Sequence, residues 1–139
     1  MARARLLKPG FFSNEELCEL PPFGRLLFAG LWTIADREGR LVDSPRWIKA
    51  QIFPFDNVPV DKLLTDLDDA GFIQRYGRPG GKKYIQVSKF SEHQKPHVRE
   101  AESTIPAPGS ALDEDEQRQT LDVPKDDLRS PVSKSVPKS

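Results

Sequence analysis

The sequence predicts an α+β fold in which three to four helices accompany a small antiparallel β-hairpin. Apolar residues recur at helical spacing over residues 60–70, at Val60, Leu63, Leu64, Leu67 and Ala70. Gly71 follows as a helix stop. Residues 72–76 and 83–87 are typical of strands, and a glycine-rich turn at 77–82 joins them. A helix that leads into a hairpin with a basic tip is the second half of a winged helix-turn-helix.

The preceding segments supply the other helices. Ser13 and Asn14 offer a cap, with acidic residues in the first turn, for a short helix that ends near Leu20. Residues 23–35 carry the longest apolar pattern, which covers most of the helix circumference and predicts a central buried helix. The small apolar residue Cys18 is expected in the core.

A short strand and a third helix are expected next. Residues 41–42 favour a strand that pairs with the later hairpin. Ser44 followed by Pro45 begins a helix that Pro54 ends. Its apolar side includes Trp47, which we expect in the core, as we do Trp32, rather than exposed as a base-stacking platform. The complete order is that of a winged helix with an extra helix at its N-terminus.

Composition divides the chain near residue 100. Residues 1–100 hold 16 Lys and Arg against 13 Asp and Glu, a net charge of +3, and residues 101–139 hold 5 against 8, a net charge of −3. The second segment is rich in proline and has few apolar residues, so we predict a disordered acidic tail after a domain spanning residues 1–100. A single cysteine and the absence of a signal sequence or an ~18-residue apolar run predict a cytoplasmic protein without membrane contact.

No catalytic chemistry is predicted. The sequence offers no nucleophile–base set, and we expect neither an enzyme nor a cofactor. His93 and His97 are four residues apart, but Pro96 interrupts the helix that would align them, and neighbouring ligands are lacking, so no metal site is expected. These histidines suit either phosphate contact or local capping of the last strand. The turn at 77–82 lacks the spacing of a phosphate-binding loop.

Several blocks occur in an order that resembles one family. The blocks are Lys8-Pro9-x-Phe11-Phe12, Leu26-Leu27-Phe28-x-Gly30-Leu31-Trp32-x-x-Ala35-Asp36-Arg37-Glu38-Gly39-Arg40, Ile48-Lys49-x-x-x-Phe53-Pro54, Leu63-Leu64-x-x-Leu67-x-x-x-Gly71-Phe72-Ile73 and Tyr84-Ile85-x-Val87-x-x-Phe90-x-x-His93-Gln94-x-Pro96-His97. Together they resemble the N-terminal winged-helix domains of bacteriophage and prophage replication proteins, the replisome organisers and initiators. The resemblance implies binding of double-stranded origin DNA in a bacterial host cell. It also implies recruitment of the replicative helicase or its loader.

The charged residues predict which surfaces meet DNA. The outward side of the helix at 60–70 carries four carboxylates and one lysine, which suits a polyanion poorly. Either this helix meets DNA only by its N-terminal end, around residues 57–62, or the contact lies elsewhere. The alternative surface comprises the wing, a basic N-terminal arm and the polar side of the preceding helix, and we expect DNA contact through the wing and the arm. The candidate DNA-binding residues are Arg3, Arg5, Lys8, Arg46, Lys49, Lys62, Arg75, Arg78, Lys82 and Lys83.

Other interpretations of the same residues stay open. The cations also suit an ordinary solvated surface. The acidic helix face and the acidic tail favour a protein–protein adaptor of the replisome, or a platform for self-association. A transcriptional regulator would use the same fold.

Overall fold

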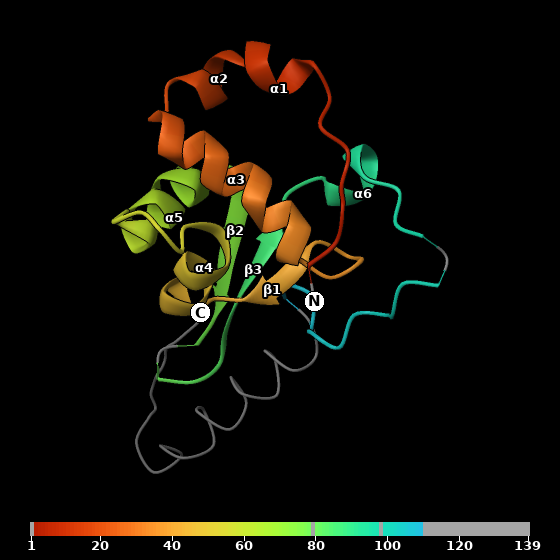
Figure 1. The fold of residues 1–139 in the computed structure, drawn as a ribbon. Helices are drawn as coiled ribbons and strands as arrows, with labels where there is room; N and C mark the ends of the chain where they lie inside the picture. The colour runs from red at the N-terminus through yellow and green to blue at the C-terminus, as the bar shows by residue number, and fades with distance from the viewer. Residues whose placement is uncertain (1, 79, 98, 110–139) are drawn as a thin grey trace, which may run out of the picture. The chain divides into compact units, whose positions relative to one another are not determined.

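A computed structural model describes residues 2–78, 80–97 and 99–109 of the 139-residue chain. The chain divides into two units, residues 1–105 and 106–139. Of the second unit residues 106–109 are described, and they end in a turn at Pro108 and Gly109. The first unit has an α+β fold (Figure 1). Its elements are α1 (Gly10–Ser13), α2 (Glu15–Cys18), α3 (Pro22–Ile34), β1 (Arg40–Val42), α4 (Pro45–Ile52), α5 (Val60–Asp69), β2 (Ile73–Gly77), β3 (Lys83–Val87) and α6 (Phe90–His93).

Capping residues in the sequence explain where the helices begin. The Asn14 side chain accepts a hydrogen bond from the Leu17 N–H at 3.0 Å and starts α2. Ser44 does the same for α4, where it accepts from the Trp47 N–H at 3.3 Å and Pro45 takes the first helical position. The predicted positions of both helix starts are confirmed. The short helices α1 and α6 were not predicted.

The sheet has three antiparallel strands in the order β1–β3–β2. Ile85 of β3 lies opposite Leu41 of β1 on one side and opposite Arg75 of β2 on the other. The predicted pairing of residues 41–42 with the hairpin is therefore confirmed.

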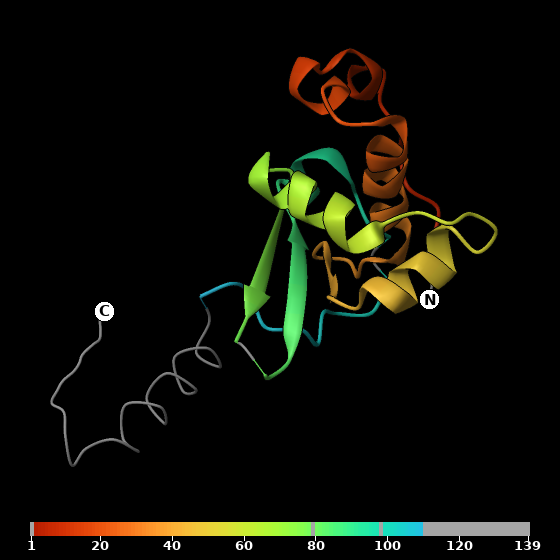
Figure 2. The same cartoon turned by 90° about the vertical axis from the view of Figure 1, so that its left-hand side faces the viewer.

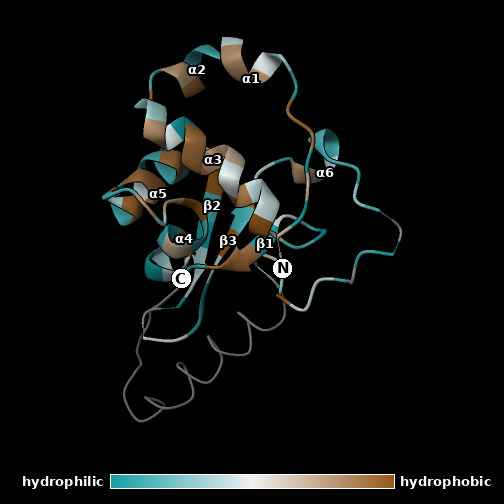
Figure 3. Ribbon diagram, viewed as in Figure 1, coloured by the Kyte–Doolittle hydropathy of each residue, from teal (hydrophilic) through white to brown (hydrophobic). Residues whose placement is uncertain are grey.

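The core fills the space between α3, α4, α5 and the sheet. Figure 3 shows hydrophobic residues gathered on α3 and on the strands behind it. The largest fully buried side chains of the core are Leu17, Leu27, Leu31, Ile48, Phe53, Leu64, Leu67, Ile73 and Ile85. Burial of this apolar surface is the main favourable contribution to folding.

Three predictions of burial were wrong. Phe23 and Leu26 are about half exposed, because only the side of α3 that carries Leu27 and Leu31 faces the other elements. Trp47 is 42% exposed, because the neighbouring residue Ile48 occupies the buried side of α4. Cys18, at the end of α2, is exposed as well.

The first unit continues beyond the predicted boundary at residue 100. The Ser103 hydroxyl donates a hydrogen bond to the Asp36 carboxylate, and an Arg40 Nη1–H donates to the Ile105 carbonyl at 3.2 Å. Residues 101–105 are thus joined to the unit that the tail was expected to follow. The disorder predicted for residues 110–139 lies outside the described residues.

No helix in the described part of the chain is long and apolar enough to cross a membrane.

Candidate nucleic-acid interface

The β2–β3 hairpin ends in a tight turn that carries exposed cations. The last paired residues are Gly77 and Lys83, and the Gly81 N–H donates to the Arg78 carbonyl at 3.0 Å, which closes the turn. Arg78, Lys82 and Lys83 are all exposed. Figure 2 shows the two strands running away from α5 toward this turn. The fold therefore gathers three of the predicted DNA-binding cations at the end of the hairpin.

Arg75, predicted as a fourth wing cation, forms structural ion pairs. Its Nε and Nη2 atoms bind the two Asp43 carboxylate oxygens at 2.7 and 3.0 Å. Nη2 also binds Asp61 at 2.7 Å, and Nη1 donates to the Thr65 hydroxyl at 3.1 Å. The hydrogen bond with Asp43 is the largest cause that raises the pKa of Arg75 above its ordinary value. Arg75 therefore joins β2 to α5 and to the β1–α4 turn, and is not available to a phosphate.

The outer face of α5 is acidic, as expected from the sequence. Asp61 and Asp69 are exposed, and Asp66 is partly exposed. Lys62, the one cation on this helix, lies 3.1 Å from the Asp66 carboxylate in an i, i+4 ion pair. The face that would enter a major groove in a helix-turn-helix protein therefore repels phosphate.

The predicted cations of α4 and of the N-terminal segment lie on separate elements from the turn. Arg46 is exposed on the first turn of α4. Lys49 is partly buried and donates to the Phe53 carbonyl at 3.5 Å, so it contributes to the end of the same helix. Lys8 is exposed just before α1.

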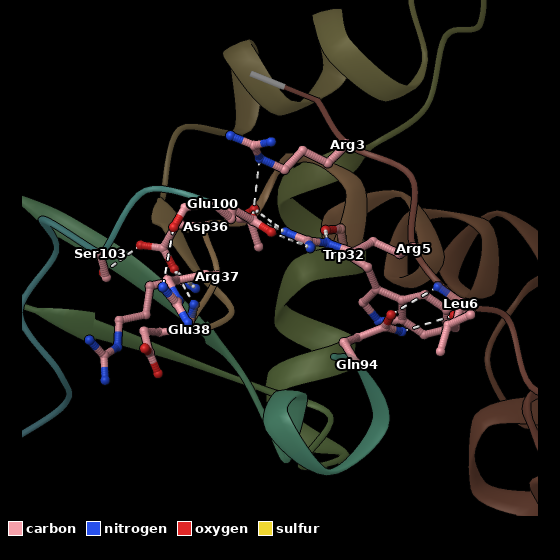
Figure 4. A network of polar contacts seen from close by, with 12 residues as sticks. Arg3, Arg5, Leu6, Trp32, Asp36, Arg37, Glu38, Gln94, Glu100 and Ser103 are labelled. Atoms are coloured by element: carbon pink, nitrogen blue, oxygen red, sulfur yellow. Dashed lines mark hydrogen bonds and ion pairs between the residues drawn. The ribbon is translucent and has the colours of Figure 1, made fainter. Parts of the chain in front are cut away.

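Arg5 is not part of a basic arm, which corrects the prediction made for it. Its side chain is 5% exposed, and its Nη2 atom lies 2.7 Å from Oε1 of Glu100 (Figure 4). It also donates to the backbone carbonyls of Trp32 and Ala35 at 2.9 and 3.1 Å, and lies over the Phe90 ring. The Arg5 guanidinium is therefore almost fully buried and engaged by protein groups.

Contacts of Arg3 and Leu6 also hold the N-terminal segment in place. Arg3, whose side chain is 43% exposed, pairs with Glu100 at 3.2 Å, and its N–H donates to the Thr33 carbonyl at 2.7 Å. The buried Gln94 side chain exchanges two hydrogen bonds of 2.9 Å with the Leu6 backbone. The residues that fix this segment, Glu100 and Gln94, lie in a polar stretch where periodicity gives no signal. Spacing in the sequence does not reveal such long-range pairs.

The carboxylate of Glu100 is the centre of this network. Hydrogen bonding from Arg5 is the largest cause that holds the pKa of Glu100 below its ordinary value of 4.5. Burial acts in the opposite direction, and the charges of Arg3 and Arg37 act in the same direction as Arg5. The carboxylate is therefore ionised at neutral pH, and the positive charges of the neighbouring arginines balance its negative charge.

One pocket lies beside the end of α3, β1 and residues 100–105. Its volume is about 520 Å³, and it is lined by Arg37, Arg40 and Trp47 among others. Both arginines are engaged, Arg37 with the Glu100 carbonyl at 3.2 Å and Arg40 with the Gln86 side chain at 2.9 Å. No group of three or more His, Cys, Asp or Glu side chains suited to a metal ion occurs within the described residues.

Comparison with protein-family models, with curated proteins and with solved structures finds no match for this chain.

Proposed function

We propose that this chain binds double-stranded DNA as a winged helix in which the β2–β3 hairpin is the wing. The element order from α3 to β3 is helix, strand, helix, helix, strand, hairpin turn, strand. The sheet order β1–β3–β2 places the first short strand beside the second hairpin strand. Both features agree with a winged helix-turn-helix plan in which α4 and α5 are the helix pair.

The observation that carries the proposal is the separation of charge between hairpin and helix. Duplex DNA carries about one negative charge per 1.7 Å of axis. Its surface therefore attracts cations and repels carboxylates. The exposed cations Arg78, Lys82 and Lys83 meet this requirement, whereas the outer face of α5 does not. The chain is therefore proposed to approach DNA with the wing first. Arg46 and Lys8 remain secondary phosphate contacts in this proposal.

The proposed setting is the initiation of phage-type DNA replication in the cytoplasm of a bacterial host. This setting rests on the family resemblance of residues 3–100, with origin DNA as ligand and a replicative helicase or its loader as partner. Neighbouring genes that encode a helicase or loader would support it. A promoter-linked phenotype without a replication defect would point to a transcriptional role.

Fluorescence anisotropy of a labelled duplex at two salt concentrations tests the DNA-binding proposal. The triple variant Arg78→Ala, Lys82→Ala, Lys83→Ala is expected to weaken binding. It should also reduce the slope of log K against log salt by roughly 2–3, because each phosphate contact contributes about 0.9. Lys95→Ala is the control, since it removes an exposed cation that is not among the candidate DNA-binding residues. Equal slopes for the triple variant and the wild type would contradict the proposal.

A protein–protein adaptor is the second candidate, favoured by the acidic outer face of α5. A basic surface on a partner would complement the exposed Asp69 and the net negative charge of this face, on which Asp61 and Asp66 already pair with Arg75 and Lys62. Pull-down from host lysate after nuclease treatment tests this candidate with the variant Asp69→Lys, because Asp69 is exposed and has no part in the Arg75 ion pairs. A partner captured equally by wild type and variant would argue against this face.

A further inference from the structure

We infer that copies of this chain associate head to tail, with Phe55 of one copy inserted into an aromatic pocket of the next. The inference goes beyond the proposed function, because it concerns an interaction between copies and requires no DNA.

The loop between α4 and α5 presents an aromatic ring to solvent. Phe55 is 95% exposed, whereas Phe53, two residues earlier, is buried. The Phe53 ring packs against Phe23, which is itself about half exposed, so this part of the surface carries a second apolar ring. Contact of apolar surface with water is unfavourable, and aromatic side chains are enriched where proteins bind one another. Phe55 is therefore suited to anchor a protein–protein contact.

A pocket elsewhere on the fold is suited to receive an aromatic ring. It has a volume of about 370 Å³ and lies between the N-terminal segment, α1, α2, α3 and α6. Four aromatic residues line it, Phe11, Phe28, Trp32 and Phe72. The rings of Phe11 and Phe28 meet Trp32 edge-on, with centroids 5.5 and 5.3 Å away, which is a favourable arrangement for aromatic rings. We call this cavity the aromatic pocket. A further ring can enter it and continue the same type of packing.

The charges beside the ring and beside the pocket are opposite. Asp56 follows Phe55 and is exposed. Lys8 and His93 line the aromatic pocket and are also exposed, and Asp and Glu are absent from the described residues that line it. Neither Lys8 nor Asp56 forms an ion pair with another residue in the described part of the chain. Insertion of Phe55 would bring Asp56 to the basic rim, so the two surfaces are complementary in charge as well as in polarity.

Phe55 cannot fill the pocket of its own chain. Figure 1 shows the loop between α4 and α5 and the helix α6 on opposite sides of α3. Phe53 and Val58, on either side of Phe55 in sequence, are both buried in the core and hold the loop in place. The ring therefore belongs in the pocket of a second copy. A contact between two different surfaces of identical chains is head to tail, and it repeats to form a ring or a filament.

The expected association is weak. Each contact has one anchoring side chain, and small interfaces give transient complexes. We therefore expect a dissociation constant above about 10 µM. In more dilute solution the chain is then a monomer, and Phe55 contributes little to its stability.

Sedimentation velocity of the full chain without DNA, from about 5 to about 500 µM, tests the inference. The sedimentation coefficient of the wild type is expected to rise with concentration. Phe55→Ala should weaken association at least about 30-fold, the effect of removing a central anchor. Val42→Ala is the control, because it removes apolar atoms from a half-exposed position on β1 outside both surfaces, and it should associate like the wild type.

A second variant blocks the pocket and leaves the ring of Phe55 free. Gly10 lines the aromatic pocket, and a Cβ added to it meets no atom within 4 Å, so Gly10→Trp can cover the pocket without a backbone clash. Phe55→Ala and Gly10→Trp should each remain monomeric alone. An equimolar mixture should form pairs and nothing larger, because one variant supplies the ring and the other supplies the pocket.

Exchange of charge tests the orientation of the contact. Asp56→Lys and Lys8→Asp should each weaken association, and the double variant should recover most of the loss because the ion pair is restored in reverse. Circular dichroism of every variant verifies that the fold is retained.

Three results would overturn the inference. They are a wild type that stays monomeric at the highest concentration, a Phe55→Ala variant that associates as strongly as the wild type, and a mixture of the ring and pocket variants that forms no pairs. The proposed function is tested separately by the anisotropy titration, so either proposal can fail while the other stands.

Discussion

Arg5 and Glu100, 95 residues apart in sequence, face each other as a two-pronged ion pair with nitrogen–oxygen distances of 2.7 and 3.1 Å. The two side chains are 5% and 4% exposed. The pair holds the N-terminal segment against the chain that leaves α6, and the ring of Phe90 lies beneath the guanidinium at 5.2 Å. Parallel hydrogen bonds of this kind add geometric specificity to the attraction between charges.

Removing one member of this pair should destabilise the protein strongly. Glu100→Gln keeps the side-chain shape but leaves the buried Arg5 charge without its counterion. Breaking a buried pair in this way typically costs about 3–5 kcal/mol. Urea unfolding followed by circular dichroism measures the change in free energy of unfolding. Glu102→Gln, at an exposed neighbour, is the control and should change it by less than about 0.5 kcal/mol. A loss below about 1 kcal/mol in Glu100→Gln would contradict the structural role of the pair.

The same carboxylate predicts how stability depends on pH. Its pKa is lower in the folded protein than its ordinary value of 4.5, so the unfolded chain binds the proton first. The contribution of Glu100 is therefore complete above that value and is lost as pH falls through the lower pKa of the folded state. Unfolding titrations between about pH 7 and about pH 3 should show a smaller acid loss for Glu100→Gln than for wild type. Parallel pH curves for the two proteins would refute this assignment.

Local signals in the sequence were sufficient for most of the fold. The caps at Asn14 and Ser44 and the apolar spacing of α5 act within one or two turns, and they correctly predicted these helices. The strand-like residues 72–76 and 83–87, joined by a glycine-rich turn, correctly predicted the hairpin.

Whether a charged side chain is exposed or held in an ion pair depends instead on residues far away in sequence. Arg5 and Arg75 are residues of the type that binds DNA phosphates. In the structure, however, Arg5 pairs with Glu100 and Arg75 pairs with Asp43. Of the cations predicted on the wing, only Arg78, Lys82 and Lys83 stay in the proposed DNA contact.

The two carboxylates that share Arg75 should differ in their effect on stability. The Asp43 side chain is 4% exposed and accepts two hydrogen bonds from Arg75, whereas Asp61 is 72% exposed. Asp43→Asn should reduce the free energy of unfolding by about 1–3 kcal/mol, and Asp61→Asn by less than about 1 kcal/mol. Chemical denaturation of both variants provides the comparison. A larger loss in Asp61→Asn would mean that the exposed pair dominates.

The turn between α3 and β1 depends on Gly39. Its backbone lies at φ +81°, and an added Cβ would lie 2.5 Å from Cβ of Phe90. Gly39→Ala should therefore cost about 2–4 kcal/mol, from the left-handed backbone and from the clash together. Gly71 is the matched control, because it has φ +86° but open space around the same position. Gly71→Ala should cost only about 1–2 kcal/mol, and thermal unfolding of both variants isolates the contribution of the clash.

The loop between α4 and α5 carries two phenylalanines with opposite environments. Phe53 is 1% exposed and packs edge-on against Phe23, with ring centroids 5.6 Å apart, whereas Phe55 is 95% exposed. Phe53→Ala should cost about 3–5 kcal/mol because it leaves a cavity in the core, and Phe55→Ala should change the free energy of unfolding by less than about 0.5 kcal/mol. Denaturant unfolding of the two variants, under the same conditions, measures both values. A substantial loss in Phe55→Ala would show that this ring is buried in solution, through folding of the loop onto the domain or through self-association. Repeating the measurement at several protein concentrations would distinguish the two cases, because only self-association makes the unfolding midpoint depend on concentration.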